Sequence, residues 1–214
     1  MFYFYSLLFI IFLFYWVFSL VPRGTCMATP ECSKWIFFSC STMGRDHTVH
    51  GFQFRSDVVA ANDQNQVISA VVAVCHLRDV YTLTEQPSDS DFFGYPAWRE
   101  AMKFTKARVL ETCLQPYGHE MLKDEVLVTT MPPWVDALLV RARPQGRVVS
   151  SKKPGYEEFY SKREKKGKPG QTWVSGGKKL SASEHFPTKF AQAIATAVVR
   201  LAGVGTGLSE FSAV

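Results

Sequence analysis

A run of positively charged residues between Arg141 and Lys179 is the part of this sequence best suited to chemistry. It holds twelve Lys and Arg residues against three glutamates, a local charge of +9, whereas the whole chain carries +5. Charge concentrated in this way creates a local field that attracts polyanions. The cations that we expect to contact a polyanion are Arg141, Arg143, Arg147, Lys152, Lys153, Lys162, Arg163, Lys165, Lys166, Lys168, Lys178 and Lys179.

Aromatic residues are interleaved with these cations. Tyr156, Tyr160 and Trp173 lie within the same basic segment, and rings placed among cations can stack on unpaired bases. Phosphate contacts made by Lys and Arg are blind to sequence and sensitive to salt. We therefore expect a non-enzymatic protein that binds nucleic acid without sequence specificity. Three alternatives remain at this point: docking on anionic lipid, docking on an acidic protein partner, and a solvated basic loop that keeps the chain soluble.

The cysteines and histidines do not have the spacing of a metal site. Cys26, Cys32 and Cys40 precede His47 and His50, but structural zinc sites usually pair ligands two to four residues apart. The neighbouring Cys75-His76 pair is no better as a catalytic pair, because adjacent residues on a helix point in different directions. No H-E-x-x-H or G-x-S-x-G motif occurs. We predict no catalytic residue, no metal and no cofactor.

The first twenty residues contain no charged side chain and no histidine. A helix of that length covers about 30 Å, the thickness of a bilayer core. The pattern predicts a single transmembrane anchor over residues 1–20 and a linker over 21–33. The basic residues that follow, Arg23 and Lys34, favour a C-terminal part on the cytoplasmic or matrix side. A mis-called start, with Met27 or Met43 as the first residue, is the competing interpretation.

An anchored chain has a second interpretation. It could be an accessory single-pass subunit of a membrane protein complex, with the anchor docked on other membrane helices and the basic loop on acidic neighbours.

The remaining elements predict an α+β domain over residues 34–203, which includes the basic segment, followed by a flexible tail over 204–214. We expect a helix that is capped near Asn62 or Asp63 and ends at Leu77, and then a polar loop over 82–94.

The second half of the chain contains three clearer patterns. Apolar residues at helical spacing predict a helix from Pro96 through Cys113, and Val126–Thr130 has the composition of a strand. The last helix follows Pro187 and places Phe190, Ile194 and Leu201 on one apolar face, with Gly203 as its stop.

One short segment resembles a known kind of sequence. Residues 173–177 read WVSGG, and residues 184–195 read EHFPTKFAQAIA. Together, over 173–195, they resemble a stretch that closes a domain in retroelement-type polyproteins of marine protists. The resemblance implies a domesticated or fragmentary non-catalytic piece, and it adds no site residues.

Overall fold

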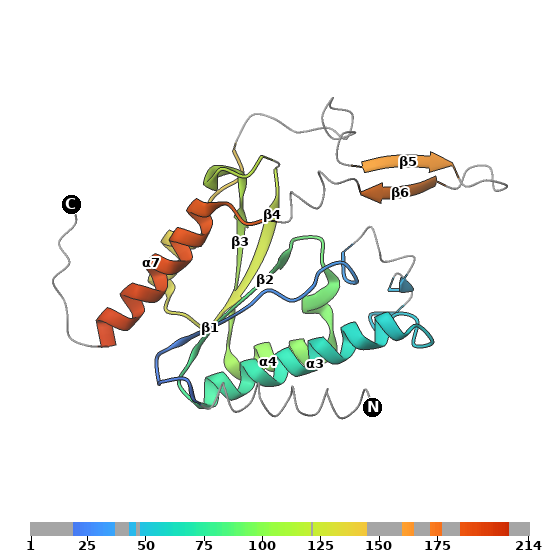
Figure 1. Ribbon diagram of the computed structural model, residues 1–214. Helices are drawn as coiled ribbons and strands as arrows, with labels where there is room; N and C mark the ends of the chain where they lie inside the picture. The colour runs from blue at the N-terminus through green and yellow to red at the C-terminus, as the bar shows by residue number, and fades with distance from the viewer. Residues whose placement is uncertain are drawn as a thin grey trace.

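A four-stranded mixed sheet with helices on both faces forms the body of the protein (Figure 1). The computed structural model describes residues 19–36, 43–45, 48–120, 122–144, 160–164, 172–176 and 185–205. The strands of the sheet are β1 (Thr25–Ala28), β2 (Tyr81–Pro87), β3 (Arg108–Cys113) and β4 (Asp124–Thr129), in the spatial order β1-β2-β4-β3. The predicted α+β class is confirmed.

Helices and short helical turns connect these strands. The α-helices are α3 (Ser56–Leu77), α4 (Pro96–Thr105), α5 (Asp136–Leu139) and α7 (Thr188–Gly205). The 3-10 turns are η1 (Asp91–Gly94), η2 (Gln115–Tyr117) and η3 (Pro133–Val135). A separate antiparallel hairpin is formed by β5 (Tyr160–Glu164) and β6 (Thr172–Gly176).

The pairing of the strands follows from their connections. β1 and β2 are parallel, and a parallel pair needs a long crossover, which α3 supplies. β4 then runs antiparallel to both β2 and β3. The order leaves β1 and β3 as the two edges of the sheet.

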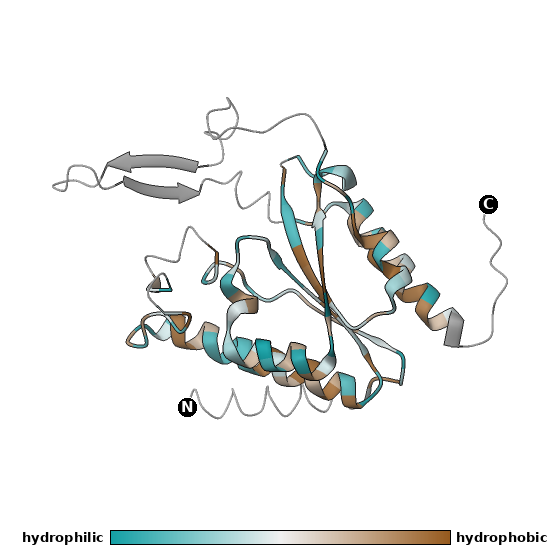
Figure 2. Cartoon of the chain, turned by 180° about the vertical axis from the view of Figure 1, so that it is seen from behind, coloured by the Kyte–Doolittle hydropathy of each residue, from teal (hydrophilic) through white to brown (hydrophobic). Residues whose placement is uncertain are grey.

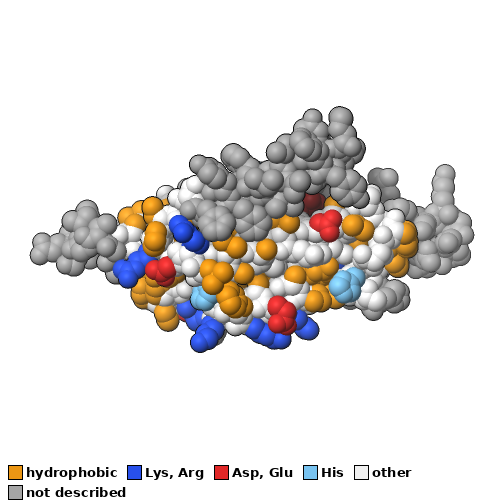
Figure 3. Space-filling view, turned by 90° about the horizontal axis from the view of Figure 1, so that it is seen from below, with side chains coloured by type: hydrophobic (Ala, Val, Ile, Leu, Met, Phe, Trp, Pro, Cys, Tyr) orange, Lys and Arg blue, Asp and Glu red, His pale blue; other side chains and the backbone are white. Residues whose placement is uncertain are grey.

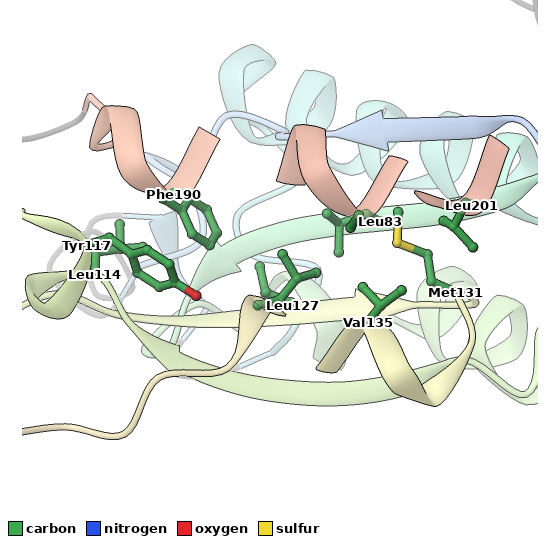
Figure 4. Packing of buried hydrophobic residues seen from close by; sticks show 10 residues of the cluster. Leu83, Leu114, Tyr117, Leu127, Met131, Val135, Phe190 and Leu201 are labelled. Carbon is green, nitrogen blue, oxygen red and sulfur yellow. The ribbon is translucent and has the colours of Figure 1, made fainter. Parts of the chain in front are cut away.

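The two faces of the sheet carry different hydrophobic clusters. Helices α3 and α4 lie over one face and α7 over the other, as two opposite views show (Figures 1 and 2). Because side chains alternate along a strand, Leu83 and Leu127 reach the face where Phe190 and Leu201 of α7 are buried (Figure 4). Val128 belongs to the cluster on the opposite face, with Trp35, Phe92 and Trp98.

The predicted polar loop over 82–94 is wrong in its first half, because β2 is a central strand of the sheet. Several of its polar side chains are buried and have hydrogen-bond partners elsewhere in the fold. The composition of the segment does not reveal these partners. Gln86 Nε2 donates to the Pro30 carbonyl at 2.6 Å, and Ser90 Oγ donates to Gln86 Oε1 at 2.8 Å. Thr129 Oγ1 donates to the Thr82 carbonyl at 2.8 Å. Such bonds remove the cost of burying polar groups.

The predicted helix from Pro96 through Cys113 is two elements. The helix α4 ends at Thr105, because Lys106 adopts a left-handed conformation with φ 52°. The residues that follow form β3, whose partners on β4 run from Arg108↔Thr129 to Cys113↔Asp124. The helical spacing therefore corresponds to a helix only as far as Thr105. Beyond that residue, pairing with β4 decides the structure, and the chain forms a strand.

Two boundaries in the first half of the chain also differ from expectation. β1 lies inside the segment that was expected to be a linker, where it pairs with β2. Helix α3 begins at Ser56, so Asn62 is not a cap. Asn62 is buried within the helix, where it accepts from Arg45 Nη2 at 3.0 Å and donates to the His50 carbonyl at 2.8 Å.

At the other end of the chain, α7 follows Pro187 as expected and runs two residues past Gly203. The predicted tail beyond Gly205 lies outside the described residues.

The predicted membrane anchor needs correction. Across the described residues, no helix combines the length and the apolar character that crossing a bilayer requires. Residues 1–18, which hold most of the expected span, lie outside the described part of the chain. This finding contradicts the predicted single-pass membrane localisation, and the interpretation as a membrane-complex subunit, which depended on it, loses its basis.

The core assignment of α7 leads to a stability prediction. Phe190 is 0% exposed and stacks edge-on against Tyr117 with ring centres 5.1 Å apart, whereas Val199 on the same helix is 70% exposed. Phe190→Ala should lower the free energy of unfolding by about 3–5 kcal/mol, and Val199→Ala by less than about 0.5 kcal/mol. Chemical denaturation of both variants measures the difference. Equal losses would show that α7 does not pack through this face.

Candidate functional site

Two of the predicted polyanion contacts, Arg141 and Arg143, lie on described chain directly after α5. Arg141 Nη1 donates to the carbonyls of Ala137 and Val140 at 2.9 and 2.8 Å. Its guanidinium also lies 5.3 Å from the ring centre of Tyr117. A cation in this place satisfies the carbonyls that a helix end leaves without partners. Arg141 is therefore used, at least in part, to end α5.

Arg143 remains more open to a ligand. It forms an exposed ion pair with Asp124, with Nη1 3.6 Å from Oδ2, and such pairs contribute little free energy. The two arginines line a polar hollow of about 420 Å³, whose walls also include Glu111 and Asp124. These carboxylates offset the arginines, so the hollow is not a strongly positive site.

The hairpin β5–β6 holds the described centre of the basic segment. Its register pairs Arg163 with Trp173 and Lys162 with Val174, and Tyr160 faces Gly176. Two of the predicted cations, Lys162 and Arg163, therefore lie in the same hairpin as two of the predicted stacking residues, Tyr160 and Trp173. Among the described residues, the hairpin is a two-stranded sheet of its own, separate in its pairing from the four-stranded sheet.

The rest of the predicted site falls outside the described residues. These positions are Arg147, Lys152, Lys153, Tyr156, Lys165, Lys166, Lys168, Lys178 and Lys179. Their part in a polyanion site stays a prediction.

On the face shown in Figure 3, the described residues do not form a second basic surface. There, lysines and arginines are interspersed with acidic and apolar side chains (Figure 3). Several cations of the body are in ion pairs, such as Lys103 with Glu100 at 2.8 Å and Arg55 with Asp57 at 2.9 Å. Arg55, assisted by Lys34, holds the pKa of the Asp57 carboxyl well below its usual range.

A pair of buried carboxyl groups in the sheet was not anticipated from the sequence. Glu85 of β2 and Glu125 of β4 are diagonal neighbours on the face that α7 covers, and they are 5% and 0% exposed. Among the described residues, neither Glu125 oxygen has a hydrogen-bond donor of ordinary geometry, although Lys123 Nζ lies 2.9 Å from Oε1. Burial, together with the neighbouring Glu125 carboxyl group, raises the pKa of Glu85 to about 9. Glu85 therefore keeps its proton at neutral pH.

The groups around this pair fix its charge state. Burial opposes the charge of Lys123, but the Glu125 and Glu85 carboxyl groups outweigh burial and raise the Lys123 pKa. Nearby, burial raises the pKa of the Cys32 thiol to about 11, so Cys32 is not a nucleophile at neutral pH. The arrangement places two buried carboxyl groups inside the sheet beside one ammonium group. Its components are forty residues apart in the chain, and only the strand pairing brings them together.

The histidines and Cys75 do not assemble into a reactive centre. His50 Nδ1 lies 3.4 Å from the Tyr95 hydroxyl, and the His76 ring packs edge-on against Phe104 with centres 5.4 Å apart. Cys75 is a buried core residue, while His47 and Cys40 lie outside the described chain. Within the described residues, no group of three or more His, Cys, Asp or Glu side chains is placed to hold a metal ion.

Comparison with known proteins finds no match for this chain. No protein-family model matches the chain, and neither does any curated protein or any solved structure. The resemblance of residues 173–195 to retroelement-type polyproteins therefore stays an expectation.

The buried carboxyl pair predicts how stability depends on pH. In the unfolded chain, Glu85 has its ordinary pKa of 4.5, and in the folded chain about 9. Between these values, only the folded protein holds the proton. The free energy of unfolding should then fall as pH rises from about 5 to 9, by up to about 1.4 kcal/mol per pH unit. Denaturation of the full chain at several pH values measures this slope.

The variant Glu85→Gln keeps a hydrogen-bond donor but cannot titrate. It should flatten the slope and be more stable than the natural chain near pH 9. Glu100→Gln on the surface of α4 removes an equal charge and should leave the slope unchanged. If the free energy of unfolding of the natural protein rises over this pH range, Glu85 does not keep its proton in the folded state.

Proposed function

We propose that the protein binds single-stranded nucleic acid through its basic segment, residues 141–179, with the hairpin β5–β6 at the centre of the contact surface. The observation that carries the proposal is the strand register, which pairs Arg163 with Trp173. Because residues alternate between the two faces of a strand, Lys162 and Tyr160 belong to the other face of the same ladder. Paired residues on an antiparallel ladder are direct neighbours, so the register makes a basic residue the neighbour of an aromatic one.

The distribution of charge supports the same proposal. The basic segment carries +9, so the remainder of the chain carries −4. An anionic polymer would be attracted to the segment and repelled, weakly, by the rest of the protein. Lys and Arg contacts would release counterions from the phosphates, and this gives affinity without sequence preference.

The roles of the individual residues follow from their chemistry. Lys162 and Arg163 would pair with phosphates, and Arg143 would extend that contact toward the sheet, since its pair with Asp124 is exposed. Tyr160 and Trp173 would stack on bases, which duplexes keep inside their own stack. The proposed ligand is therefore a single strand rather than a duplex.

The electrostatic part of the proposal is tested by salt. Titration of the full-length protein with a labelled single strand should give a logarithm of affinity that falls linearly with the logarithm of salt concentration, by about 0.7 per phosphate contacted. Replacing both Lys162 and Arg163 by Ser should weaken binding to every sequence alike and flatten the slope by about 1.4.

The matched control places the same charge change elsewhere. Arg99→Ser combined with Lys103→Ser removes two cations from the surface of α4 and should leave both the affinity and the slope nearly unchanged. No binding at low salt would overturn the proposal. Equal binding to vesicles of anionic lipid would show that the segment recognises a charged surface and not a nucleic acid.

The stacking part is tested separately. Trp173→Ala should weaken binding to a single strand by about 1–3 kcal/mol and affect duplex binding less. Trp134→Ala is the control, because Trp134 is a partly exposed tryptophan of the described body. Equal effects of the two substitutions on single-strand affinity would show that no base stacks on Trp173.

A further inference from the structure

Two free cysteines lie together at the edge of the sheet. Cys26 lies on the edge strand β1, and Cys75 lies in the last turn of α3. Both thiols are unoxidised, and both belong to one small apolar cluster with Val71 and Val80. A backbone bond from the Val80 N–H to the Cys75 carbonyl, 2.8 Å long, fixes the end of α3 beside the start of β2.

The two buried thiols lie in the same small apolar cluster. The neighbouring Cys75 lowers the pKa of the Cys26 thiol, against the effect of burial. Cys26 in turn, together with burial, raises the pKa of the Cys75 thiol. Cys26 is therefore the more acidic thiol of the two.

We infer that Cys26 and Cys75 form a dithiol site that peroxides oxidise to an intramolecular disulfide. The Cys26 thiolate attacks one oxygen of hydrogen peroxide, the O–O bond breaks, and the products are a Cys26 sulfenic acid and hydroxide. The Cys75 sulfur then displaces the sulfenic oxygen, forms the S–S bond and releases that oxygen as water. In total, two thiols and one peroxide give one disulfide and two water molecules, so the sulfur atoms lose two electrons and the peroxide gains them.

The position of the pair suits a small oxidant. Cys26 is 7% exposed and Cys75 is 0% exposed, so a bulky reagent would reach neither sulfur readily. β1 has a neighbouring strand on only one side, and hydrogen peroxide is little larger than water. The disulfide would fasten this edge strand to α3.

The other described cysteines do not share these properties. Cys32 lies near the Glu85–Glu125 pair, and burial raises its pKa. Burial is also the main cause that raises the pKa of Cys113, which bonds to Asp124. Neither residue belongs to the cluster that holds Cys26 and Cys75, so both should stay reduced under conditions that link that pair.

Mass spectrometry of the full-length protein after mild hydrogen peroxide treatment tests the inference. We expect the loss of two free thiols per chain, a mass decrease of two hydrogens, and a linked peptide pair that contains Cys26 and Cys75. Dithiothreitol should restore both thiols. Linkage through any other cysteine, sulfinic acid at a single residue, or two thiols that persist would each overturn the inference.

Variants separate the two steps. In Cys75→Ala, Cys26 has no resolving thiol, so its sulfenic acid should accumulate and be trapped as an adduct by dimedone that is present while the protein is unfolded. In Cys113→Ala, the Cys26–Cys75 disulfide should form as in the natural chain. A Cys75→Ala protein that gives no adduct, at peroxide levels that consume both thiols of the natural chain, would contradict the assignment of Cys26 as the attacking sulfur.

Discussion

The burial of two carboxyl groups, those of Glu85 and Glu125, is the constraint on which the rest of the sheet depends. Both groups are buried on adjacent central strands, and neighbouring carboxylates that are both ionised repel each other. A proton kept by Glu85 and the ammonium group of Lys123 beside Glu125 make the burial tolerable. With that charge balanced, β2 can be covered on both faces, and α3, α4 and α7 can pack on the sheet.

The same architecture explains why the basic segment can serve binding. The chain leaves the body after α5 and returns to it as α7, and Leu139 and Phe190, from these two helices, belong to one hydrophobic cluster. Residues 145–184, which hold most of the basic segment, therefore connect two helices of the same core in the sequence. Segments that connect core elements commonly carry binding residues.

Elements with a strong local signal were predictable, and elements defined by pairing were not. The α7 stripe and the start of α4 at Pro96 could be read from spacing, since an amphipathic helix carries its own period. The strand β2 could not, because Thr82, Thr84, Glu85 and Gln86 make it look like a loop until their buried partners are known. Likewise, β3 continued a helical spacing by chance. The basic segment was visible in the composition, whereas the carboxyl pair depends on a register that no local pattern encodes.

Photochemical crosslinking tests the central claim, that the hairpin of the basic segment contacts single-stranded nucleic acid, most directly. A single strand substituted with 5-bromouracil is irradiated with the full-length protein at low salt, and the attached peptides are mapped. We predict crosslinks in the peptides that contain Tyr160 and Trp173, with loss of the second when Trp173 is replaced by Ala. Crosslinks confined to α3, α4 or the hollow beside Glu111, or none at all, would contradict the account.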